Sequence, residues 1–189
     1  MKPLTTVLQS LPEFRELTAQ LDAGRSPVAV AGLTTVHRAH LAAALREATG
    51  RPLVLLCPDE QEGKRLQSDL AFFTGESVEL LMGREFVFHN ATVSRQWEHR
   101  RLALLRAMQK GEAPIVVMTV EGLLQRTMPP AVLEGSVVTL ETGKRYDLNR
   151  LTDRLVRAGY TRCMTVEGPG QFALRGGILD VFSPGGESP

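Results

Sequence analysis

Several features that mark common protein classes are scarce or missing in this sequence of 189 residues. Its two cysteines, Cys57 and Cys163, stand in apolar surroundings without the CxxC or Cys/His spacing of a metal site. That pattern predicts buried free thiols in a reducing compartment. No apolar run approaches the ~20 residues that span a bilayer, and the N-terminus lacks the basic start and apolar block of a signal peptide. We therefore expect a cytoplasmic protein with no membrane partner.

The sequence also lacks a strong excess of positive or negative charge. Lys and Arg number 22 against 21 for Asp and Glu, which gives a formal net charge of +1. A dedicated nucleic-acid binder usually carries a strong basic excess, so any contact with DNA would have to be local. Hydrophobic residues make up 43% of the chain and charged residues 23%, proportions that allow a packed core.

The first part of the chain alternates apolar strand patterns with amphipathic helix patterns. After one or two short helices in residues 1–24 that end at Gly24, strands are expected at residues 28–31, 53–57, 78–82 and 115–119, with helices between them. Asp59 followed by Glu62 has the spacing of a capping box at the start of one of these helices. This order predicts an α/β fold with a parallel sheet covered by helices on both faces.

The pattern changes at Pro129-Pro130, a pair that ends a short helix and suggests a domain boundary. We expect a first domain at 1–134 and a smaller α+β domain at 135–189. The second domain should contain a strand at 137–140, a helix capped by Asp147, a strand near Met164 and a closing hairpin. The turn-rich residues 183–189 have no strand after them, so this domain is expected to be incomplete.

The closing hairpin joins strand patterns at 171–174 and 178–182 through Arg175-Gly176-Gly177, where glycines permit the positive φ of a tight turn. Period-2 alternation places Arg175 on the face of Gln171 and Ala173, opposite Phe172. The guanidinium should therefore point away from the buried ring, where it is free to hold the carboxylate of a partner.

The turn after the first predicted strand occupies the place of a phosphate-binding loop but lacks its chemistry. The sequence runs from Gly32 through Thr34 to His37, Arg38 and Ala39. The last three replace the second glycine, the lysine and the hydroxyl residue of G-x-x-x-x-G-K-[ST]. Arg38 could keep a positive charge there, but Ala39 cannot bind Mg²⁺. We expect an ordinary turn without ATP catalysis.

Other candidate sites have weaker support. His37 and His40 are three residues apart, but nothing nearby completes a metal shell, so exposed or capping roles are expected. A helix predicted at 93–109 buries Trp97 and carries an outer arginine face formed by Arg95, Arg100, Arg101 and Arg106. A solvated helix face is favoured over one that tracks a phosphate backbone. His89 and His99 are expected to be a partly buried loop residue and a surface helix residue.

Over essentially its whole length the chain resembles the N-terminal module of the bacterial transcription-repair coupling factors (Mfd), a family similar to the damage-recognition protein UvrB. The resemblance is carried by Gly-Gln-Phe-Ala-Leu-Arg-Gly-Gly-Ile-Leu-Asp-Val-Phe at 170–182, Leu-Leu-Gln-Arg at 123–126 and Ala-Gly-Tyr at 158–160. The degenerate loop at 32–39 favours this family over UvrB, whose phosphate-binding loop is intact.

The resemblance implies a helicase-like sheet that has lost nucleotide hydrolysis, followed by a domain that binds UvrA. The arginine of the family's Arg-Gly turn lies in the UvrA contact and corresponds to Arg175, followed by Gly176. ATP, Mg²⁺, RNA polymerase and double-stranded DNA belong to other parts of the full-length family members. The expected function is therefore non-catalytic recruitment of UvrA in nucleotide excision repair. The alternative is a nucleotide- or DNA-binding remnant that uses Arg38 and the arginine face.

Overall fold

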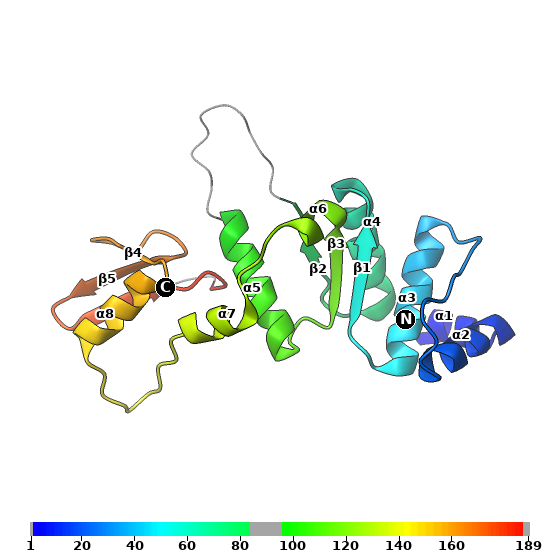
Figure 1. Ribbon diagram of the computed structural model, residues 1–189, viewed down its shortest axis with the longest axis horizontal. Coiled ribbons are helices and arrows are strands. Elements are labelled where there is room, and N and C mark those ends of the chain that lie inside the picture. Colours follow the sequence, from blue (N-terminus) through cyan, green and yellow to red (C-terminus); the bar gives the residue numbers. More distant parts are fainter. Residues whose placement is uncertain (1, 84–95, 187–189) are drawn as a thin grey trace. The chain divides into compact units, whose positions relative to one another are not determined.

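The computed structural model describes residues 2–83 and 96–186 of the chain (Figure 1). The chain forms two compact units, the first from 1–85 with 110–125 and the second from 86–109 with 126–189. The helices are α1 (Lys2–Gln9), α2 (Pro12–Asp22), α3 (Thr35–Thr49), α4 (Glu60–Thr74), α5 (Gln96–Lys110), α6 (Val120–Leu124), α7 (Pro130–Ser136) and α8 (Leu148–Arg157). The strands are β1 (Leu53–Cys57), β2 (Glu79–Leu81), β3 (Ile115–Thr119), β4 (Thr161–Arg162), β5 (Gln171–Arg175) and β6 (Ile178–Phe182). None of the described helices is long and apolar enough to cross a bilayer.

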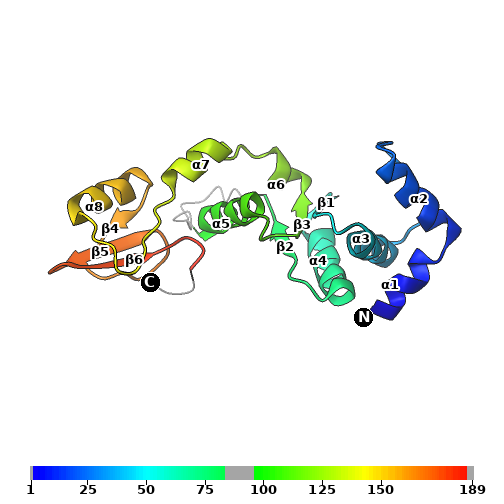
Figure 2. The ribbon, with the colours of Figure 1, turned by 90° about the horizontal axis from the view of Figure 1, so that it is seen from below.

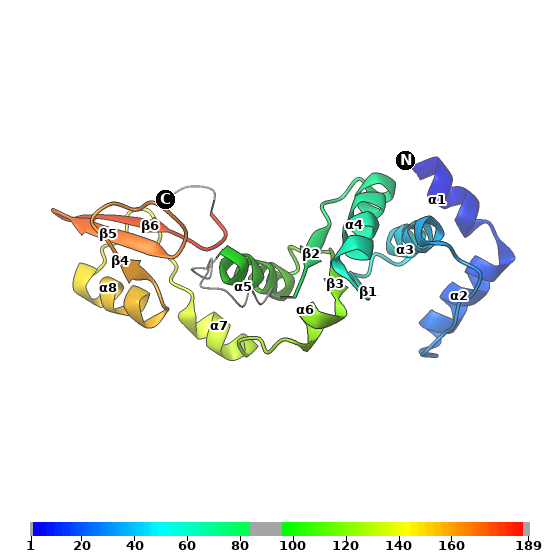
Figure 3. The same cartoon turned by 90° about the horizontal axis from the view of Figure 1, so that it is seen from above.

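The first unit is built on a parallel sheet of three strands in the order β1-β3-β2. Val117 of β3 pairs with Leu55 on one side and with Leu80 on the other. All five residues of β3 are buried, as expected for a central strand. Helices α3 and α4 lie side by side against one face of this sheet (Figures 2 and 3). The parallel α/β arrangement predicted for this part of the chain is confirmed.

Local sequence signals explain where the helices of the first unit begin and end. The Asp59 carboxylate accepts a hydrogen bond of 2.8 Å from the backbone N–H of Glu62, which confirms the predicted cap of α4. Helices α3 and α4 end at Gly50 and Gly75, both in the left-handed conformation that glycine adopts without strain. The core between helices and sheet consists of Ala39, Ala43, Cys57, Leu66, Leu70, Val78, Ile115 and Val117.

The strand predicted at 28–31 is wrong. These residues form no regular secondary structure, and Val30 is 49% exposed. A strand needs a partner for its backbone N–H and C=O groups, and the described ladders of this sheet join only β1, β3 and β2. Helices were also predicted to cover both faces of the sheet. This is wrong at β1, because Val54 and Leu56, on the face opposite the core, are exposed.

The second unit contains a small mixed sheet in the order β4-β5-β6, with β4 parallel and β6 antiparallel to β5. Helix α8 lies along this sheet (Figure 2). It begins at the predicted cap, where Asp147 accepts hydrogen bonds from the backbone N–H groups of Asn149 and Arg150. Its inner residues Leu151 and Leu155 are buried, as is Phe172 of β5. The second part of the chain is thus a small α+β unit.

Two details of this unit differ from the predictions. Residues 137–140 form no strand, and the Val137 carbonyl instead accepts a hydrogen bond of 3.2 Å from the Arg154 guanidinium. Helix α6 ends at Leu124, before the proline pair. Pro130 instead occupies the first turn of α7, where a missing N–H leaves no hydrogen bond unmade, so the pair opens a helix and does not end one. The last of the three divisions between the two units lies at 125/126, and the predicted domain boundary at 134/135 stays a prediction.

Candidate protein-interaction site

The hairpin of β5 and β6 has the tight reversal that its sequence predicts. Gly176 and Gly177 form the turn with φ values of 55° and 92°, a conformation that residues with a Cβ adopt only under strain. Because this turn has two residues, the register is fixed, and Arg175 pairs with Ile178 while Ala173 pairs with Asp180. The hairpin therefore presents a defined set of side chains at its end.

Arg175 is exposed at this end, as predicted, but it has a partner within its own hairpin. Its Nη2 donates to Oδ2 of Asp180 at 2.7 Å, and the side chains of Arg175 and Asp180 are 64% and 34% exposed. In an antiparallel pair, diagonal residues on one face are close enough for such contacts. The pair limits the conformations of the guanidinium and leaves its other N–H groups accessible to a ligand.

Ile178 completes the surface at the end of the hairpin. It lies directly across from Arg175 and is 66% exposed, so a large apolar side chain and a cation share one face of the ribbon. We call Arg175, Ile178 and Asp180 the hairpin-end surface. Arginine is enriched at protein-interaction surfaces, and the exposed aliphatic side chain beside it adds apolar area.

The sequence predicted that Arg175 would be exposed but did not single out Asp180 or Ile178 as its neighbours on this surface. The signal that could have found them is the length of the turn. Two central residues fix which residues face one another, so Asp180 must lie diagonally across from Arg175.

The loop predicted to be a degenerate phosphate-binding loop has its polar groups engaged with the chain itself. Gly32 has a positive φ of 81°, and Oγ1 of Thr34 lies 3.1 Å from Nδ1 of His37. Arg38 forms an ion pair of 2.9 Å with Glu62, which offsets the charge that a phosphate would need. Ala39 is fully buried in the core and cannot face a nucleotide.

Ligands of open α/β sheets usually bind at the carboxyl ends of the strands. In the first unit this place holds a small hollow of about 130 Å³, and its charged lining residues are all acidic: Asp59, Glu60 and Glu121. Carboxylates repel the phosphates of a nucleotide. The thiol of Cys57 at the end of β1 is buried, and this burial raises its pKa above the usual range.

The predicted arginine face of α5 is corrected in one position. Arg101 is only 6% exposed and its guanidinium lies over the Trp97 ring, 5.4 Å from the centroid. The two residues are four apart, so they share a face of the helix. Burial lowers the pKa of Arg101 from its usual value. Arg100 is exposed as predicted, Arg106 pairs with Glu134, and Arg95 lies outside the described residues.

The histidines have structural partners where the structure describes them. His40 lies 3.0 Å from the Leu4 carbonyl and stacks on Phe73, with ring centroids 4.8 Å apart. His99 packs closely against Gly170, and His89 lies outside the described residues. Within 2–83 and 96–186, no group of three or more His, Cys, Asp or Glu residues could hold a metal ion.

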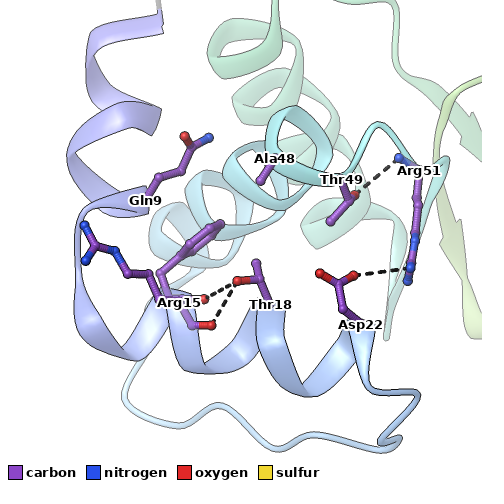
Figure 4. A pocket seen from close by; sticks show the side chains of 8 residues that line it. Gln9, Arg15, Thr18, Asp22, Ala48, Thr49 and Arg51 are labelled. Atoms are coloured by element: carbon purple, nitrogen blue, oxygen red, sulfur yellow. Dashed lines mark hydrogen bonds and ion pairs between the residues drawn. The ribbon is translucent and has the colours of Figure 1, made fainter.

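A larger hollow of about 430 Å³ lies between α2 and the end of α3 (Figure 4). Phe14 contributes a buried ring to it, and Arg51 reaches Asp22 across one end at 3.4 Å. Thr18 donates its hydroxyl hydrogen to carbonyl groups of its own helix. Thr18, Asp22 and Arg51 thus have partners within the chain, which leaves fewer polar groups of the hollow for a ligand.

Comparison with known proteins adds to this geometry. The sequence profile of the UvrB interaction domain matches residues 138–189, which contain the whole hairpin-end surface. The transcription-repair-coupling factor of Myxococcus xanthus is 33% identical over 90% of the chain. Those of Escherichia coli and Bacillus subtilis are 31% and 28% identical over 95% and 100% of the chain. The chain is a homologue of the N-terminal region of the transcription-repair-coupling factors.

The chain spans about one sixth of the length of these curated relatives, 15% or 16% in each case. Within the transcription-repair-coupling factor family, it therefore corresponds to a limited region that includes a UvrB interaction domain. Arg175 and Gly176 fall inside the matched domain, whereas Gly32, Thr34, His37, Arg38 and Ala39 fall outside it.

Proposed function

We propose that this chain is a non-catalytic protein-interaction module that recruits UvrA during transcription-coupled nucleotide excision repair. The observation that carries the proposal is the hairpin-end surface, in which Arg175 is exposed and held by Asp180 inside a match to the UvrB interaction domain. The relatives of the chain are named transcription-repair-coupling factors, which supports a role in linking transcription to repair.

The chemistry of the hairpin-end surface suits an acidic patch on UvrA. Arg175 keeps N–H donors that Asp180 does not use, and Ile178 supplies apolar area next to the charge. Gly176 and Gly177 hold the end of the hairpin in a tight turn, so binding does not require the backbone to be ordered first. A pre-ordered arginine that becomes buried against a carboxylate is a common hot spot.

The loop at 32–39 supports the non-catalytic part of the proposal. Arg38 is paired with Glu62, Ala39 is buried, and the carboxyl ends of the strands carry acidic side chains. These features disfavour a bound triphosphate. We therefore expect calorimetric titration with ATP and Mg²⁺ to give no micromolar binding.

The test is the affinity of the chain for purified UvrA, measured by biolayer interferometry with wild-type protein and Arg175→Ala. We expect the substitution to weaken binding by about 30-fold, because hot-spot arginines typically contribute about 2 kcal/mol. Arg157→Ala is the matched control, since Arg157 is an exposed arginine of α8 in the same unit. It should leave the affinity within about twofold of wild type.

Circular dichroism and thermal unfolding should show that both variants fold like the wild type. Equal affinities of folded Arg175→Ala and wild-type protein would refute the role given to Arg175. A wild-type chain that fails to bind UvrA would refute the proposed function itself.

A further inference from the structure

Helix α6 has an unusual distribution of side chains. Val120, Leu123 and Leu124, spaced i, i+3 and i+4, are 44%, 50% and 77% exposed, so its apolar face points to solvent. A short helix in a globular protein normally turns such a face to the core. The arrangement leaves three large apolar side chains on one exposed face, as protein-interaction sites often do.

On the side of α6 that faces the sheet, the helix backbone at Gly122 packs directly against the end of β2. A Cβ on Gly122 would lie 2.6 Å from the carbonyl oxygen of Leu81, so only glycine lets the helix approach the end of β2 this closely. Oγ1 of buried Thr119 accepts hydrogen bonds from the N–H groups of Gly122 and Gly83 at 3.0 and 3.2 Å. These contacts fix the orientation of α6 and hold its leucines outward.

The charges beside this face are acidic. Glu121 is exposed on α6 itself, and it lines the small hollow at the end of the sheet together with Asp59 and Glu60. Two basic residues are near these carboxylates: Lys64, which pairs with Glu60, and Arg126, which follows α6 in the sequence. They offset the negative charge only in part. A partner with apolar residues and basic neighbours would complement both features.

We propose that the α6 surface, formed by Val120, Glu121, Leu123 and Leu124, docks an amphipathic helix of a partner protein whose apolar stripe is bordered by lysine or arginine. The leucines supply the apolar contact area. The carboxylates of Glu121 and Asp59 favour a partner helix with lysine or arginine beside its apolar stripe. This surface belongs to the first unit, whereas the hairpin-end surface belongs to the second.

The test uses a fluorescein-labelled helical peptide of leucine and lysine, with about five turns and a lysine-bordered apolar stripe. Its binding to the full 189-residue chain is measured by fluorescence anisotropy. Backbone amide chemical shifts then locate the contact. We expect binding with the largest shifts at residues 120–125, and weaker binding of a peptide with glutamate in place of lysine.

Leu123→Gln combined with Leu124→Gln should reduce the affinity at least tenfold, because two large apolar contacts are lost while glutamine keeps helix propensity. The matched control is Leu4→Gln with Val7→Gln, which removes two exposed apolar residues of α1 and should leave the affinity unchanged. Glu121→Gln should weaken binding severalfold and reduce its dependence on salt.

Three outcomes would overturn the proposal. The first is unchanged affinity in the folded leucine double variant, and the second is an equal loss in the α1 control. The third is self-association of the wild-type chain that the leucine double variant abolishes, because α6 would then bind a second copy of the chain.

Discussion

At the scale of single residues, Gly122 is a position where the fold leaves no room for a side chain. Its missing side chain permits direct backbone contact between α6 and the end of β2, with a hypothetical Cβ only 2.6 Å from the Leu81 oxygen and 3.1 Å from the Met82 carbonyl carbon. Backbone atoms cannot rotate away as a flexible side chain can. Even one added methyl group should therefore force α6 to shift.

Gly122→Ala is expected to lower the free energy of unfolding by about 2–3 kcal/mol, the typical cost of overpacking a tight contact. Urea denaturation followed by circular dichroism measures it. Gly135→Ala is the control, because Gly135 lies in helix α7 and a Cβ there meets nothing within 4 Å. That variant should be neutral or more stable by up to ~1 kcal/mol. Equal stabilities of the two variants would contradict the close contact at Gly122.

At the scale of secondary-structure elements, helix α8 shows how a local signal fixes an element. Asp147 accepts hydrogen bonds from two N–H groups of its first turn, at 2.9 and 3.3 Å. Asp147→Ala should destabilise the second unit by about 1 kcal/mol, whereas Asp147→Asn, which keeps an acceptor, should cost less. Thermal unfolding of the two variants checks this order. The reverse order would mean that the charge of Asp147, and not its capping bond, dominates.

Elements defined by such local signals could be predicted from the sequence, and the caps at Asp59 and Asp147 and the Gly176-Gly177 turn are confirmed. The strands expected at 28–31 and 137–140 were wrong because a strand needs a partner strand, and an apolar run does not say whether one is available. Hydrophobic pattern alone also gave no hint that β3 would be the central strand of the sheet.

The candidate site was predictable to a similar extent. The exposed position of Arg175 follows from alternation along β5, and its bond to Asp180 required the register of the hairpin. Arg101 was placed on the wrong side of α5 because the prediction did not use its four-residue spacing from Trp97. The outward face of α6 depends on the tertiary contact at Gly122, which no local pattern reveals.

At the scale of the whole molecule, each unit has buried residues of its own: those of the first lie around β3, and those of the second include Phe172. Phe172→Ala should destabilise the second unit by about 3–5 kcal/mol, because Phe172 is fully buried. Hydrogen exchange read out by mass spectrometry should show faster exchange in β5, β6 and α8 and unchanged protection in β1 and β3. Faster exchange throughout the chain would indicate a single cooperative unit.

The polypeptide passes from one unit to the other three times, at 85/86, 109/110 and 125/126. Neither unit is therefore one continuous stretch of sequence. A gene fragment that starts at 126 would encode the mixed sheet with α7 and α8 but would omit α5, which belongs largely to the same unit. A protein engineer who wants to transplant the hairpin-end surface into another scaffold must either carry two segments or replace the helix left behind.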